Sequence, residues 1–118
     1  MSIQKSVGNP EHDIPVVPAL TANDVMILAE TFRLLGDPSR LKILLCCMEN
    51  SSSVSDIAEN VGLSQSLVSH HLRLLRGARL VKGERQARQV FYSIADKHVS
   101  QVLMDMATHI SEEHPEDQ

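Results

Sequence analysis

The chain has 118 residues, 42% of them hydrophobic, which suffices for one compact domain with a small core but not for two. No apolar run approaches the roughly 20 residues that cross a bilayer, and no secretory signal opens the sequence, so we expect a cytoplasmic protein. The net charge of −4 hides a division, because residues 70–93 hold six basic side chains and one acidic, whereas residues 96–118 hold one basic and six acidic. A local basic block of this kind is typical of phosphate-binding surfaces.

The chain is predicted to consist of one domain between two short terminal segments. Residues 1–20 carry three of the five prolines and little periodic apolar pattern, so we expect a flexible N-terminal arm there. The domain spans residues 21–113, and residues 114–118 form an acidic tail.

Capping residues predict the first two helices of the domain. Thr21 and Asp24 have the spacing of a capping box and begin a helix that runs to about Leu35. Asp37, followed by a proline, caps a second helix that runs to about Asn50. The residues expected to face the core are Val25, Leu28, Ala29, Phe32 and Leu35 in the first helix and Leu41, Leu44, Leu45 and Met48 in the second.

The next segment has the pattern of a helix-turn-helix. Ser53 caps a short helix that runs through Asn60, Gly62 makes the turn, and Ser64 caps a longer helix over residues 65–77. The longer helix divides by its period into a core side and a polar side of the kind that lies in a DNA major groove. The core side carries Val68, Leu72 and Leu75, with a partly buried His71, and the polar side carries Gln65, Ser66, Ser69, His70 and Arg73.

A β-hairpin is predicted to follow the helix-turn-helix. A first strand follows Leu80 and Val81, a charged turn lies around residues 83–88, and the second strand covers residues 89–94. A helix-turn-helix followed by such a hairpin is a winged helix, so we predict a mainly α fold with a small β-hairpin. The expected contacts to double-stranded DNA are Ser64, Gln65, Ser66, Ser69, His70 and Arg73 from the helix and Arg85 and Arg88 from the wing.

Three segments carry a family resemblance that extends over about residues 22–113. They are Leu35-Gly36-Asp37-Pro38-Ser39-Arg40-Leu41, Gly62-Leu63-Ser64-Gln65-Ser66-Leu67-Val68-Ser69-His70-His71-Leu72 and Arg88-Gln89-Val90-Phe91-Tyr92. The chain resembles the ArsR/SmtB family of metalloregulatory winged-helix repressors. The resemblance implies a homodimer, joined through its N- and C-terminal helices, that binds an inverted-repeat operator when metal-free and dissociates when metal binds.

The last helix, expected from about Asp96 to Glu113, carries two separated pairs of metal-ligating residues. His98 and His109 lie within about 20° of one face but roughly 16 Å apart along the axis, too far to share one zinc ion. If two copies pack antiparallel, Asp96 and His98 of one chain meet His109 and Glu112 of the other, forming two sites per dimer. The seam for this packing is Val99, Val102, Leu103, Met106 and Ile110.

The spacing Asp-x-His followed by His-x-x-Glu matches the zinc-sensing, SmtB-like branch of the family. Two imidazoles and two carboxylates suit tetrahedral Zn(II) and accept Co(II) as a surrogate. By resemblance, His109 also donates a hydrogen bond to a backbone carbonyl near Arg79 and so transmits metal binding. Thiophilic branches carry Cys-Val-Cys where this chain has Ser53-Val54-Ser55, so a thiolate site is not expected.

Three alternatives remain beside zinc sensing. A nickel or cobalt sensor needs further ligands, for which the chain offers His114 and the cluster Glu11, His12 and Asp13. Cys46 and Cys47 are neighbours that suit core packing, with thiol redox sensing as the alternative. A metal-dependent hydrolase is disfavoured because the four ligands fill the metal shell and no general base is evident, so we expect no enzyme activity.

Overall fold

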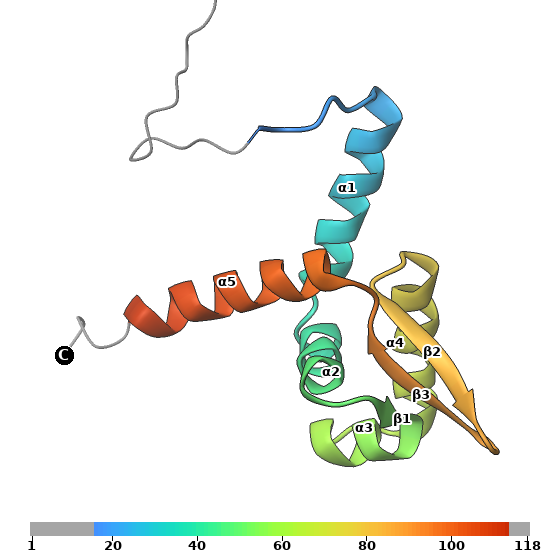
Figure 1. Ribbon diagram of the computed structural model, residues 1–118. Helices are drawn as coiled ribbons and strands as arrows, with labels where there is room; N and C mark the ends of the chain where they lie inside the picture. The colour runs from blue at the N-terminus through green and yellow to red at the C-terminus, as the bar shows by residue number, and fades with distance from the viewer. Residues whose placement is uncertain (1–15, 114–118) are drawn as a thin grey trace, which may run out of the picture.

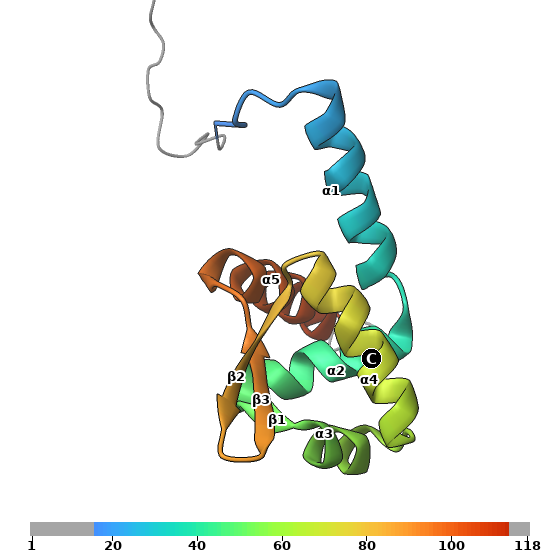
Figure 2. The same ribbon diagram turned by 90° about the vertical axis from the view of Figure 1, so that its right-hand side faces the viewer.

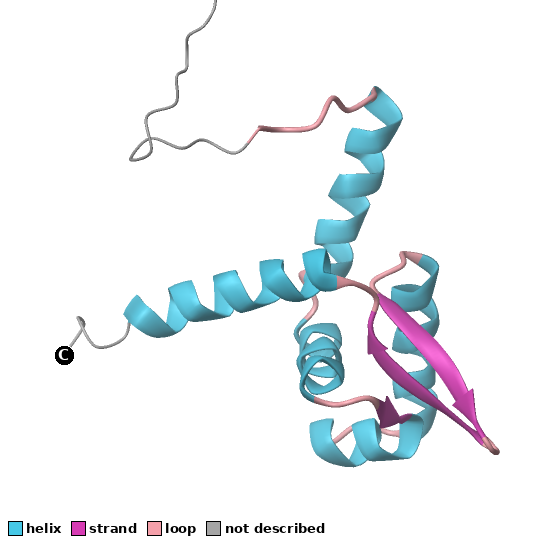
Figure 3. Ribbon diagram, viewed as in Figure 1, coloured by secondary structure: helices cyan, strands magenta, loops and turns pink. Residues whose placement is uncertain are grey.

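Five helices and a three-stranded sheet make up the part of the chain that the structure, a computed structural model, describes, residues 16–113 (Figures 1 and 3). In chain order they are α1 Ala22–Leu35, α2 Pro38–Glu49, β1 Ser52–Ser53, α3 Val54–Val61, α4 Gln65–Gly77, β2 Val81–Gln86, β3 Gln89–Ile94 and α5 Lys97–Glu113. The predicted winged helix-turn-helix is confirmed. Most of the predicted arm and the whole predicted tail, residues 114–118, lie outside the described residues.

The helices begin where capping chemistry predicts. The Thr21 hydroxyl accepts from Asp24 N at 3.0 Å, and the Asp24 carboxylate accepts from Thr21 N at the same distance, which completes the capping box. Asp37 and Ser64 cap α2 and α4, accepting from the backbone three residues on at 3.0 and 3.1 Å. Gly62 ends α3 with φ 74°, a left-handed conformation that favours glycine.

The sheet contains one strand more than the predicted hairpin. Its order is β1-β3-β2, all antiparallel, and Ser52 pairs with Tyr92. A two-residue strand of serines is too short to show an alternating pattern, so the sequence gives no sign of it. The predicted turn over residues 83–88 is also too long, because β2 continues to Gln86 and only two residues make the turn.

The core lies between α2, α3, α4 and the sheet, and α2 enters it by a different face from the one predicted. Ile43, Leu44 and Cys47 are buried, whereas Leu45 is 40% exposed. The prediction for Leu45 is therefore wrong, and Leu41 and Met48 are only partly buried. Because residues 43–48 of α2 are all apolar, the periodicity of this stretch does not decide which face turns inward.

Helices α1 and α5 project from this core as two arms at an angle to each other (Figures 1 and 2). In α1 the only buried residue is Leu34, and in α5 it is Leu103. The apolar residues predicted for the inner face of α1 and for the α5 seam are largely exposed, with Phe32 at 57% and Ile110 at 54%. Neither helix is long and apolar enough to cross a membrane, nor is any other helix among the described residues.

Candidate nucleic-acid interface and metal half-sites

Burial of one side of α4 fixes which side faces solvent. Val68 and Leu75 are fully buried and Leu72 is 2% exposed, as predicted. The polar residues of the opposite side therefore point outward. Gln65, Ser66, His70 and Arg73 are exposed, Ser69 is half-buried, and the N-cap Ser64 is exposed at the start of the helix.

The wing lies beside α4, so the predicted DNA-contacting residues of both elements share one side of the molecule (Figure 2). Gln65 of α4 lines one hollow together with Gln89 and Val90 of β3. Ser69 and Arg73 of α4 line another together with Tyr92. Arg85 and Arg88 are exposed at and near the tip of the hairpin.

Arg76 and Gln89, which are outside the predicted DNA set, are among the residues that line the same hollows. Arg76 lies one turn after Arg73 on α4, and Gln89 opens β3 opposite Gln86. Arg76 belongs to the basic block, and its spacing from Arg73 placed it on the same helix face. Gln89 carried no comparable signal, because its side depends on the register of the hairpin.

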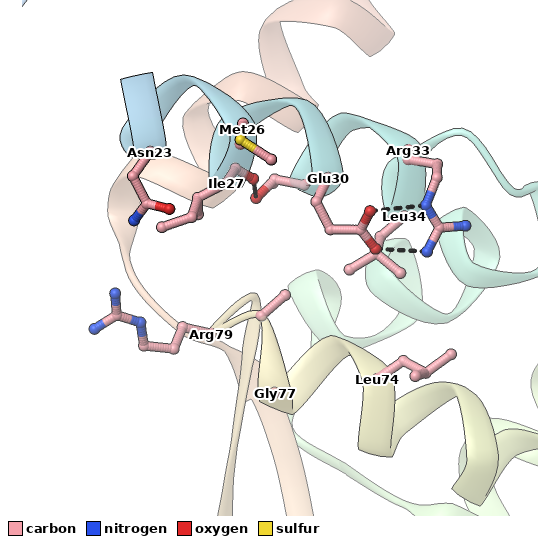
Figure 4. Close-up of a pocket in the computed structure, with 11 residues that line it drawn as sticks. Asn23, Met26, Ile27, Glu30, Arg33, Leu34, Leu74, Gly77 and Arg79 are labelled. Atoms are coloured by element: carbon pink, nitrogen blue, oxygen red, sulfur yellow. Dashed lines mark hydrogen bonds and ion pairs between the residues drawn. The ribbon is translucent and has the colours of Figure 1, made fainter. Parts of the chain in front are cut away.

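The basic side chains of this surface are not neutralised internally. Within residues 16–112 one ion pair forms, between Glu30 and Arg33 of α1, and it involves none of the basic side chains of α4 or the wing (Figure 4). The guanidinium groups of Arg73, Arg85 and Arg88 therefore remain available for phosphate contacts. The positive charge that the sequence concentrates between residues 70 and 93 thus lies on the exposed side of α4 and on the wing.

The predicted metal ligands lie near the two ends of α5. Asp96 caps the helix, with Oδ1 accepting from His98 N at 2.9 Å and from Val99 N at 3.1 Å. His109 and Glu112 lie in the last two turns, and all four side chains are exposed. Among the residues that the structure describes, no three ligating side chains of one protomer come together. Each protomer therefore presents two pairs and no complete metal shell.

The donor chemistry of these pairs fits a metal ion of intermediate softness. Each protomer offers two imidazoles and two carboxylates, the set that Zn(II) accepts in a tetrahedral shell. The capping bonds occupy Oδ1 of Asp96, and no hydrogen bond within residues 16–112 reaches its other oxygen. Ser53 and Ser55, by contrast, offer hydroxyl groups and no thiolate ligand. The two hydroxyl groups lie 3.2 Å apart, and that of Ser53 caps α3.

Arg79 follows α4 in a left-handed conformation, with φ 61°. It lines a groove between α1 and the end of α4, together with Ile27, Leu74 and Ala78 (Figure 4). Helix α5 projects away from the core (Figure 1), and no hydrogen bond joins His109 to Arg79 among the residues that the structure describes.

The two cysteines differ in their surroundings. Cys47 is 3% exposed within the core, and burial, with the neighbouring Cys46 as a smaller cause, raises its pKa to about 12. Cys46 is half-buried, and its Sγ accepts from Asn60 Nδ2 at 3.7 Å. The predicted packing role is confirmed for Cys47, whose thiol stays protonated and unreactive.

Comparison with known proteins assigns the chain to a family. Residues 37–82 match the family described as "Bacterial regulatory protein, arsR family". The chain is 44% identical to the transcriptional repressor SmtB homolog of Synechocystis over 72% of its own length, a match that spans 64% of that relative. It is 41% identical to the transcriptional regulator NmtR of Mycobacterium tuberculosis, over 75% of this chain and 79% of the relative. The transcriptional repressor SmtB of the same species is 32% identical over 91% and 84%.

Solved structures share the fold. The solution structure of apo-NmtR aligns with a TM-score of 0.69 and 38% identity, over 92% of this chain and 91% of that one. A homodimeric winged helix-turn-helix domain of Mycobacterium bovis aligns with a TM-score of 0.73 and 25% identity, over 82% and 89%. The chain therefore belongs to the arsR family of bacterial regulatory proteins, and it is a metal-responsive, DNA-binding transcriptional repressor of the ArsR/SmtB type and not an enzyme.

Proposed function

We propose that this repressor binds an inverted-repeat operator as a metal-free homodimer and releases it when Zn(II) occupies two sites formed between the α5 helices. The observation that carries the proposal is the separation of the four ligands into two exposed pairs on α5. Such pairs complete a metal shell only between subunits. Metal occupancy would thus be read at the dimer interface.

The exposed apolar surfaces of α1 and α5 support dimerisation. Side chains as large as Met26 and Met106 are 70% and 53% exposed in the protomer. Burying such surface against a second copy is favourable by about 25 cal/mol for each Å² removed from water. A related winged-helix domain is homodimeric, which agrees with this assignment.

DNA binding would use α4 and the wing of each protomer. Ser64, Gln65 and Ser66 lie at the start of α4, the part of a recognition helix that enters the major groove. His70 and Arg73 follow on the same exposed side, and Ser69, just before His70, is half-buried. Arg85 and Arg88 of the wing would contact the flanking backbone, which fixes register without reading sequence.

The regulatory ion would be held by Asp96 and His98 of one protomer and by His109 and Glu112 of the other. When bound, Zn(II) supplies a fixed link between the two α5 helices. His109 would use its second ring nitrogen to donate to a backbone carbonyl near Arg79, and so connect the dimer interface to the end of α4. Thermodynamic linkage requires that operator DNA weaken zinc binding by the same factor.

Two measurements on the full-length dimer test this proposal. Operator binding, followed by fluorescence anisotropy, is expected to weaken on addition of Zn(II). His109→Ala is expected to retain operator binding while losing the response, and normal release by that variant would overturn the relay. The Co(II) absorption spectrum is expected to show tetrahedral bands without a thiolate charge-transfer band. A six-coordinate spectrum would instead indicate a nickel or cobalt sensor with additional ligands.

A thiol-sensing function is less well supported. Burial keeps the thiol of Cys47 protonated, so one of the two cysteines lacks the low pKa that reactive thiols need. Replacing Cys46 and Cys47 with serine is expected to leave zinc-induced release intact.

A further inference from the structure

The side chain of Arg40, at the start of α2, joins three elements of the fold. Its Nε donates to Nδ1 of His71 on α4 at 3.3 Å. A terminal guanidinium nitrogen donates to the carbonyl of Leu34, at the end of α1, at 3.4 Å. The backbone N–H of the same residue donates to the capping carboxylate of Asp37 at 3.0 Å. One side chain thus connects the projecting helix α1 to the recognition helix α4.

The contact defines the protonation state of His71. A guanidinium group only donates hydrogen bonds, so Nδ1 of His71 must carry a lone pair to accept one. The imidazole is therefore neutral, with its proton on Nε2. Only 8% of His71 is exposed, which fixes the ring in the interface between α4 and α2.

The charged surroundings favour the neutral imidazole. Burial lowers the pKa of His71, the positive charge of Arg40 lowers it further, the carboxylate of Asp37 raises it, and His70 lowers it slightly. On α1, the carboxylate of Glu30 is engaged by Arg33, and Arg40 also lowers its pKa. Because the folded state disfavours the charged form, stability is lost as the pH falls below the ordinary pKa of histidine.

We propose that Arg40 is a positioning residue for operator binding, which holds the recognition helix against the end of α1 through the neutral ring of His71. The inference rests on the proposed use of α4 to read DNA. His71 occupies the position next to His70, a predicted DNA contact, with ring centres 5.8 Å apart. A shift of His71 therefore moves the DNA-facing side of α4 directly.

The contact also gives α1 a route to α4 that is separate from the metal ligands. Leu34 is the buried anchor of α1, and its carbonyl accepts from the same guanidinium group that holds His71. A change in the angle of α1 would thus alter the recognition helix without involving α5. Protonation of His71 would break the same link, because the ring then has no acceptor and faces Arg40 as a second cation.

Two substitutions at His71 separate this role from general packing. His71→Asn places an amide oxygen close to the position of Nδ1 and keeps the acceptor. His71→Gln, the matched control, places its amide one carbon further out and loses it. In chelator-treated full-length dimer, operator affinity is expected to fall about tenfold for His71→Gln, the effect of one lost buried hydrogen bond, and to stay near the original for His71→Asn.

The pH profile provides a readout that a packing defect does not change. Between about pH 8 and 5, operator affinity of the unmodified protein is expected to fall relative to that of His71→Asn, whose amide does not titrate. Equal affinities of the unmodified protein and His71→Gln, or parallel pH profiles of the unmodified protein and His71→Asn, would overturn the proposal.

Nitrogen-15 NMR of the histidine rings tests the geometry without any substitution. In the metal-free dimer, His71 is expected to show an unprotonated Nδ1 and a protonated Nε2, and the reverse tautomer would overturn the proposal even if His71→Gln fails to fold. Zinc-induced release by the unmodified protein is measured in parallel. Its absence would reject the proposed function, whereas the tautomer would still decide the role of Arg40.

Discussion

Mixing two inactive variants tests whether each metal site is shared between subunits. His98 and His109 are eleven residues apart on α5, which places them roughly 16 Å from each other, whereas the donor atoms around one zinc lie about 2 Å from the ion. His98→Ala removes a ligand from one half-site, and His109→Ala removes one from the other. Each variant homodimer therefore has two incomplete sites.

A heterodimer of the two variants is expected to regain one complete site. One of its two metal sites combines both substitutions, and the other combines intact His98 from one chain with intact His109 from its partner. If subunits of an equal mixture assort randomly, about half of the dimers are heterodimers, so about a quarter of the original tight sites return. The assay is titration with Co(II) by absorbance, then competition with a zinc chelator.

The matched control mixes His98→Ala with Asp96→Ala, two substitutions in the same half-site. Each metal site of that heterodimer lacks one ligand, so no tight site is expected to return. If the test mixture binds no more metal than its separate components, the site does not lie between subunits and the assignment of the four ligands is refuted.

Three further predictions concern the fold and the DNA surface. Leu72→Ala is expected to lower the free energy of unfolding by about 3 kcal/mol, because Leu72 is buried in the core. Leu45→Ala, at an exposed position, is expected to lower it by about 0.5 kcal/mol. Urea unfolding followed by circular dichroism compares the two variants. Arg85→Ala is expected to reduce the slope of log affinity against log salt by about 1, as for one lost phosphate contact, and an unchanged slope would remove Arg85 from the interface. Ala87→Gly is expected to stabilise the wing by about 0.5 kcal/mol in the same unfolding assay, since Ala87 has φ 58°, and a loss of stability would contradict this.

The helix-turn-helix is predictable from sequence because local chemistry decides each of its boundaries. Thr21, Asp37, Ser53 and Ser64 all cap the helices that they were predicted to cap. These bonds join a residue to the backbone three positions later, so they need no knowledge of the rest of the fold. The buried side of α4 follows equally well, since its polar and apolar residues separate by the helical period.

The errors concern features that depend on distant residues. Leu45 was predicted to be buried, but residues 43–48 of α2 are all apolar, and only the docking of α3, α4 and the sheet selects Ile43 and Cys47 instead. The strand Ser52–Ser53 exists because β3 offers a free edge beside it. The contact of Arg40 with His71 spans 31 positions and has no sequence period.

The face of α1 illustrates a limit of another kind. Its apolar residues follow the helical period, yet Val25 and Phe32 are 52% and 57% exposed in the protomer. Periodicity indicates that a face is to be buried but does not say whether the same chain or a second copy covers it. The same ambiguity holds for α5, where the proposed metal site, with His98 and His109 eleven residues apart, calls for a second copy.

The arrangement of the two arms separates reading DNA from sensing metal. The residues proposed to contact DNA lie on α4 and β2 and in the turn that follows, while the proposed ligands lie in or just before α5, so changing one set leaves the other in place. Both arms are linked to α4: α1 through the contact of Arg40 with His71, in the middle of the helix, and α5 through the sheet that follows Arg79. In the proposed dimer, a rotation of the interface would change the spacing of the two recognition helices, and spacing is the property that an inverted repeat tests.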